Sequence, residues 1–161
     1  MANTYVKNDI HIIFHTKPQN TDVLDDDLVR LHQYIGGIVK GVGALLIEVG
    51  GMTDHVHLLC SLPKTMALAD FVKKIKAESS RWIKTLNPHY YNTFSWQEGY
   101  AAYSVSTSVL PKVIEYIRNQ QEHHKIRTFM VNTKRFSKQT ILNSMSAFCD
   151  AVAPMGLKCV V

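Results

Sequence analysis

Two histidines separated by a single valine, His55-Val56-His57, are the residues of this chain whose types and spacing most directly suggest chemistry. Side chains alternate across a β-strand, so both imidazoles would project from one face while Val56 points into the core. Imidazole nitrogens are common ligands of divalent metal ions. The pair therefore predicts a metal site, although two polar residues on the solvent face of a half-buried strand would give the same pattern.

A second candidate lies on a helix expected over about 108–124, where Tyr116 and Gln120 are four residues apart. That spacing places them on one helix face, roughly 6 Å apart along the axis. A phenol, with an unperturbed pKa of about 10, is a poor nucleophile unless a cation withdraws charge from its target, such as a phosphodiester. Two histidines and the Gln120 amide oxygen are compatible with Mg²⁺ or Mn²⁺, and also with Zn²⁺ or Ni²⁺. The alternative for Tyr116 is a half-buried packing residue.

The elements that must position these residues follow from the periodicity of the apolar side chains. Strands are expected over 6–17, 44–52, 55–63 and 95–106, and helices over about 22–41 and 66–86. The order β-α-β-β-α-β is that of the α+β ferredoxin-like, split-βαβ fold, an antiparallel sheet with helices on one face. In it, the histidine pair lies on a central strand and the tyrosine on a later helix.

The chain has 161 residues, a length that predicts one domain over 1–161, with a C-terminal helical tail over 131–161. Its 18 Lys and Arg against 13 Asp and Glu give a net charge of +5. Residues 64–138 hold 13 of the basic residues and 5 of the acidic ones, which favours a polyanionic partner. The residues expected to contact nucleic-acid phosphates lie on the 66–86 helix and are Lys73, Lys76, Ser80, Arg81 and Lys84. The alternative is an ordinary solvated helix surface.

Several classes of protein are not expected. No apolar run reaches about 18 residues, and the N-terminal segment lacks the apolar stretch of a signal peptide. The three cysteines are widely spaced, so we expect reduced thiols in a cytoplasmic protein without membrane association. The glycines at 36–43 lack the GK[ST] of a nucleotide-binding loop, and no aromatic RNA-binding motif is present.

Five sequence blocks, IHIIFHTK, TDHVHLL, KAESSRWIK, SWQEGY and YIRNQ, occur in this order along the chain. Together they resemble the single-tyrosine HUH transposases of small bacterial insertion sequences, including relatives associated with repetitive extragenic palindromes. The resemblance spans about residues 4–130. It implies that His55, His57 and Gln120 hold a divalent cation, Mg²⁺ or Mn²⁺, and that Tyr116 is the nucleophile.

The resemblance also implies an activity and partners. Members of this family cleave single-stranded DNA at hairpin-marked ends, form a 5′-phosphotyrosine link and rejoin strands by the reverse reaction. The resemblance also implies an obligate homodimer, in which the tyrosine helix of one subunit often completes the metal site of the other. The alternative function is a hairpin-binding protein, derived from a transposase, that does not cleave DNA.

Four further polar residues have simpler explanations from sequence alone. His11 and His15 share one face of the first strand, but a spacing of four residues is wide for joint ligation of one ion. Asp54 precedes the histidine pair, where it would orient an imidazole or simply occupy a turn. His123 returns to the helix face of Tyr116 seven residues later, and is expected to be an exposed helix-end residue.

Overall fold

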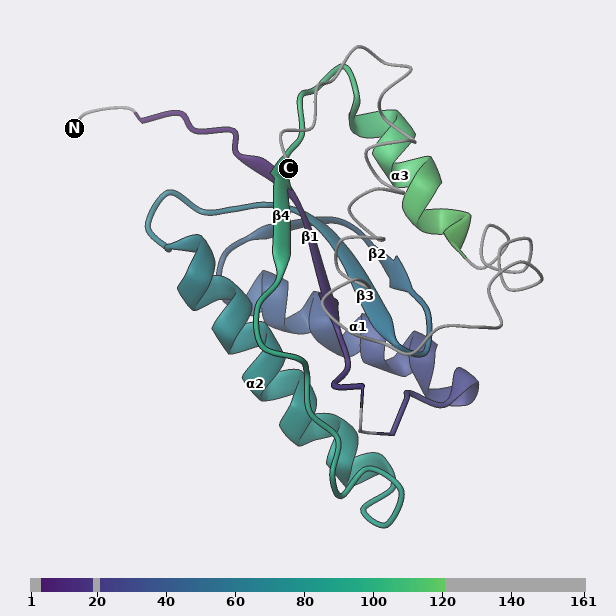
Figure 1. Cartoon of the computed structure of the whole chain (residues 1–161). Coiled ribbons are helices and arrows are strands. Elements are labelled where there is room, and N and C mark those ends of the chain that lie inside the picture. The colour runs from purple at the N-terminus through teal and green to yellow at the C-terminus, as the bar shows by residue number, and fades with distance from the viewer. Residues whose placement is uncertain (1–3, 19–20, 121–161) are drawn as a thin grey trace.

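The computed structural model describes residues 4–18 and 21–120, which form four strands and three helices (Figure 1). The strands are β1 (Asp9–His15), β2 (Leu45–Gly51), β3 (His55–Ser61) and β4 (Ala101–Ser104). The helices are α1 (Asp25–Gly41), α2 (Leu68–Leu86) and α3 (Leu110–Arg118). The predicted tail helix over 131–161 and His123 lie outside the described residues.

The four strands form one antiparallel sheet in the order β2-β3-β1-β4. This topology confirms the predicted ferredoxin-like, split-βαβ arrangement and places the histidine pair on the central strand β3. The fourth strand is much shorter than the 95–106 segment expected from sequence. At the start of the expected segment, Trp96 makes only an isolated bridge with Thr16. Residues 97–100, between Trp96 and β4, form a loop that is hydrogen-bonded to Lys76 of α2.

Helices α1 and α2 cover one face of the sheet. Alternate residues of the two central strands, such as Ile12 on β1 and Leu58 on β3, are fully buried in a core that includes Leu31 of α1 and Ile75 of α2. Apolar residues recur every three or four positions in both helices. This periodicity predicts one apolar face on each helix, and the structure packs these faces on the sheet. These two helices leave the opposite sheet face, which carries the histidines, to be covered by another element.

Helix α3 packs on that opposite face, against β2 and the outer part of β3. Val113 and Ile117 are buried there against Leu59. A β-bulge interrupts the register of β2 between Leu46 and Glu48. Because a bulge breaks the strict alternation of side chains, the consecutive residues Ile47 and Glu48 both reach α3.

Two contacts hold α3 close to the sheet. Arg118 donates a hydrogen bond from Nε to Glu48 Oε2 at 2.6 Å, forming an ion pair across to β2. A Cβ atom built on Gly50 would lie 2.9 Å from Ile117 Cγ2 and 3.0 Å from the Ile117 carbonyl oxygen. The absence of a side chain at position 50 therefore sets how closely the helix that carries Tyr116 approaches β2.

The loop between α2 and β4 is tied to both helices of the first layer. The Tyr91 hydroxyl donates to Asp27 Oδ2 at 2.9 Å and accepts from the Leu24 amide at the start of α1. Trp96 Nε1 donates to Ser79 Oγ on α2 at 3.0 Å. Trp96 is therefore a buried structural residue. No helix in the described part of the chain is long and apolar enough to cross a membrane.

We predict that Gly50→Ala destabilises the protein by about 1–3 kcal/mol, because the added methyl group would overpack the contact with Ile117. Thermal and denaturant unfolding would measure the loss. Gly37→Ala is the matched control, since a Cβ there meets nothing within 4 Å and the position lies inside α1. This control is expected to stabilise by about 0.4–1 kcal/mol. Equal responses from the two variants would contradict the steric role of Gly50.

Candidate functional site

Four histidines gather on the sheet face opposite α1 and α2. His11 and His15 come from β1, and His55 and His57 from β3. All four are buried, with exposed fractions of 0, 6, 3 and 1 %, respectively. They meet because β1 and β3 are antiparallel neighbours whose register sets His15 opposite His55 and His11 diagonally across from His57.

His11 and His57 form a direct imidazole–imidazole contact. His11 Nε2 and His57 Nδ1 are 2.9 Å apart, and the two rings stack with centroids separated by 5.1 Å. One nitrogen must donate and the other accept, so the contact couples the tautomers of the two rings and holds the orientation of the His57 ring. Burial lowers the pKa of His11 to about 3, which keeps this imidazole neutral at physiological pH.

His55 is oriented by a carboxylate. Its Nδ1 lies 2.6 Å from Asp54 Oδ1, the hydrogen-bonded arrangement that aligns a ligating imidazole. Burial acts to raise the Asp54 pKa, but the hydrogen bond and charge of His55 outweigh it, so the pKa of Asp54 is lowered. Asp54 is thus an ionised partner of His55, the first of the two roles considered for it from sequence.

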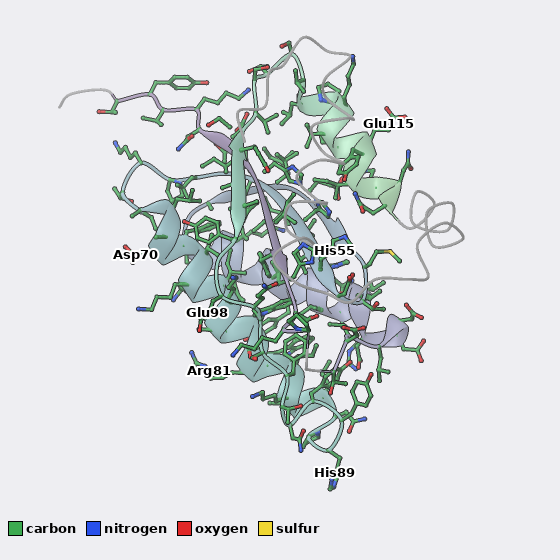
Figure 2. All side chains as sticks on the ribbon, in the orientation of Figure 1. His55, Asp70, Arg81, His89, Glu98 and Glu115 are labelled. Atoms are coloured by element: carbon green, nitrogen blue, oxygen red, sulfur yellow. The ribbon has the colours of Figure 1, made fainter. Side chains whose placement is uncertain are left out.

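Tyr116 projects from α3 onto the histidines of the same chain. Its ring centroid lies 5.6 Å from that of His57 and 6.4 Å from that of His11, both in edge-on arrangements. The structure therefore brings together the predicted nucleophile and a predicted metal ligand across a sequence separation of nearly sixty residues. Glu115, the preceding residue, points away from the sheet on the outer side of the helix (Figure 2).

Gln120 lies two residues beyond the end of α3 and is 2 % exposed. The three residues expected to supply the donor set for a divalent cation, His55, His57 and Gln120, are therefore each buried. Side-by-side imidazoles, with His55 and His57 ring centroids 5.0 Å apart, suit such a cation.

The basic residues predicted to contact nucleic acid lie on α2, across the sheet from the histidines. Lys73 and Arg81 are exposed and Lys84 is half-buried. Figure 2 shows Arg81 and Asp70 projecting outward from α2, whereas His55 lies within the fold. The α2 surface is therefore separate from the face that carries Tyr116.

Lys76 and Ser80 have partners within the fold. Lys76 donates through Nζ to the carbonyl oxygens of Gln97 and Gly99. Its ammonium also lies 5.4 Å from the centre of the Phe14 ring, and burial lowers its pKa to about 8. Ser80 Oγ donates weakly to the Phe94 carbonyl at 3.4 Å. Both residues fasten the loop between α2 and β4.

His11 and His15 are the site residues to which sequence reasoning gave too little weight. Their shared strand face was visible in the sequence, but their separation of four residues along β1 argued against cooperation. The structure shows that each pairs across the strands with a histidine of β3 instead. A pairing register between β1 and β3 was the missing information.

Comparisons with known proteins identify the family of this chain. Residues 4–120 match the family described as IS200-like transposases. The chain is 27 % identical over 116 residues to the ISDra2 transposase TnpA of Deinococcus radiodurans, covering 70 % of this chain and 83 % of that protein. It is 23 % identical over 130 residues to the transposase of insertion sequence IS200 from Salmonella typhimurium, covering 78 % and 85 %.

Two solved structures are similar in fold. One is a transposase structure from Deinococcus radiodurans, with a TM-score of 0.58, 27 % identity, and coverage of 74 % of this chain and 96 % of that one. The other is a REP-associated tyrosine transposase bound to a REP hairpin, with a TM-score of 0.57, 14 % identity, and coverage of 77 % and 73 %. A central-strand histidine pair faced by a helical tyrosine is the arrangement expected of single-tyrosine transposases. The chain belongs to the IS200-like transposase family.

We predict that His11→Leu weakens binding of Mn²⁺ by about 10–100-fold, because His57 loses the hydrogen bond that orients its ring. Isothermal titration calorimetry on the DNA-free protein would measure the change. Ile13→Val is the matched control, being a buried substitution on the same strand face that leaves the His11–His57 contact intact. Mn²⁺ affinity unchanged in His11→Leu would contradict this role.

Proposed function

We propose that this protein is a metal-dependent DNA transposase that cleaves and rejoins single strands at hairpin-marked ends through a 5′-phosphotyrosine intermediate. The observation that carries the proposal is the placement of Tyr116 over His57, with ring centroids 5.6 Å apart. A tyrosine used only for packing would not need to lie against the one strand that carries an HxH pair. Family membership supports the same conclusion.

The cation in this proposal is Mg²⁺ or Mn²⁺, held by His55, His57 and Gln120. When bound, it would withdraw charge from an oxygen of the scissile phosphodiester. The chain's own contribution is to orient the ligands. Asp54 aligns His55, and His11 aligns His57, so both imidazoles are preorganised before substrate arrives.

The nucleophile is Tyr116. Its Oη attacks phosphorus, a tyrosyl phosphate ester to the 5′ side forms, and the bond to the 3′ oxygen breaks. The phenol loses its proton, and the leaving oxygen gains one to become a free 3′-hydroxyl. Because an ester is exchanged for an ester, the bond energy is conserved, and a 3′-hydroxyl can later attack the phosphotyrosine to rejoin strands without ATP.

We further propose a homodimer as the working unit and an imperfect DNA hairpin as its partner. A REP hairpin is the DNA bound in one structure of similar fold. Cations on α2, chiefly the exposed Lys73 and Arg81 and the half-buried Lys84, are proposed to contact DNA phosphates outside the catalytic centre. For Lys76 and Ser80, contact with DNA stays a prediction, since their side chains also serve the loop that follows α2.

The decisive experiment compares wild type with Tyr116→Phe on a labelled single-stranded hairpin substrate in Mn²⁺. Wild type is expected to yield a covalent protein–DNA adduct that survives denaturing electrophoresis. Tyr116→Phe keeps the ring packing but has no nucleophilic oxygen, so adduct formation should fall below detection. An adduct of equal yield in Tyr116→Phe would overturn the assignment, whereas tight hairpin binding by a wild type that never cleaves would favour the non-cleaving alternative.

A mixing control asks which chain supplies the tyrosine. Tyr116→Phe is combined with His57→Gln under conditions that allow subunit exchange. Because Tyr116 contacts His57 of its own chain, the mixture is expected to form no more adduct than either variant alone. Recovery of adduct would show that the tyrosine acts on a partner's histidines, which would correct the within-chain arrangement but leave the chemistry standing.

The α2 surface is tested by the salt dependence of hairpin binding. Lys73→Ala is expected to reduce the slope of log affinity against log salt by about 0.7–0.9, the contribution of one phosphate contact. Fluorescence anisotropy at several salt concentrations would measure it. Lys40→Ala, an equal loss of charge from an exposed position on α1, is the control and should leave the slope unchanged. Identical slopes for both variants and wild type would remove α2 from the interface.

A further inference from the structure

A second group of potential metal ligands lies beside the HxH pair and does not include His57. It consists of His15 at the end of β1, Asp54 in the turn before β3, and His55. One potential ligand atom from each of the three residues lies within 4.8 Å of those from the other two. His15 and His55 are paired directly across the strands, with ring centroids 5.2 Å apart.

The backbone holds these three residues in place. The Thr16 amide, next to His15 in the chain, donates to the Asp54 carbonyl at 2.8 Å. The Thr16 hydroxyl is hydrogen-bonded at 3.3 Å both to that carbonyl and to Asp22 Oδ1. His15 and Asp54 are therefore joined through adjacent backbone rather than through flexible loops, so the group is present before any ion binds.

The donor types indicate which ion would bind. Two atoms bound to one ion at about 2.1 Å are at most about 4.2 Å apart, so a small side-chain adjustment would let all three residues ligate together. Two imidazoles and one carboxylate favour a divalent transition-metal ion over Mg²⁺, which prefers oxygen ligands and retains water. His15 and His55 are buried, and Asp54 is half-buried, so bulk water reaches the group mainly through the carboxylate.

We propose that His15, Asp54 and His55 form a binding site for a divalent transition-metal ion, with His15 as a ligand that the HxH motif does not supply. The site shares with the proposed catalytic set both His55 and Asp54, which orients His55 there, but it needs neither His57 nor Tyr116. Because His55 is common to both sets, an ion bound with His15 competes with one bound with His57.

The test is a titration of the DNA-free full chain with Co²⁺, followed by its visible absorption. It uses a Cys149→Ser, Cys159→Ser background, because thiolates also bind this ion. The background protein is expected to bind Co²⁺ with a visible band. Adding His57→Gln disables the proposed catalytic set, and this protein should still bind Co²⁺. Adding His15→Gln to it should then weaken Co²⁺ binding at least about tenfold.

Two more variants keep the result interpretable. Asp54→Asn retains the side-chain shape but removes the charge, and it should also weaken Co²⁺ binding about tenfold. It therefore tests the site even if His15→Gln fails to fold. His89→Gln, an exposed loop histidine, is the control and should change nothing. Thermal melting without metal checks the fold of each protein. Full Co²⁺ affinity in both His15→Gln and Asp54→Asn, loss of binding only in His57→Gln, or no binding in the background protein would each overturn the proposal.

Discussion

The register between β1 and β3 is the constraint on which the whole site depends. It sets His15 opposite His55 and Ile13 opposite His57, and it is maintained over seven consecutive residue pairs. A slip of one residue would exchange the faces of every side chain on a strand, sending the imidazoles into the apolar core. The fully buried residues of the other face, Ile12, Val56 and Leu58 among them, therefore stabilise the site by making such a slip costly.

The tyrosine depends on a second, weaker constraint. Helix α3 has only nine residues and buries just Val113 and Ile117 fully, so its position rests on few contacts. The ion pair between Arg118 and Glu48 and the close approach of Ile117 to Gly50 supply much of its attachment. A lightly held helix is consistent with the role proposed for Tyr116, in which a DNA strand enters between its hydroxyl and the histidines.

The sequence predicted the fold class, the position of the histidine pair on a central strand and that of Tyr116 on a helix, because these signals are local. Apolar periodicity defined α1 and α2, and a spacing of two placed His55 and His57 on one strand face. Contacts between segments far apart in the chain could not be read in this way. His11 and His15 looked too far apart for a shared role, because the partners that matter lie on β3. Likewise, helical spacing predicted Lys76 to be a surface cation. In the structure, its ammonium donates hydrogen bonds to the carbonyl oxygens of Gln97 and Gly99 in the following loop.

The bulge in β2 has a consequence for how the chain tolerates change. One additional residue between Leu46 and Glu48 lets Ile47 and Glu48 both face α3, while Leu46 and Val49 remain on the core side. Deleting a single residue here would restore regular pleating, but it would remove either the apolar or the charged anchor of the tyrosine helix. The length of this edge strand is thus as strictly determined as its composition, and insertions or deletions compatible with activity should fall in the turns that flank it.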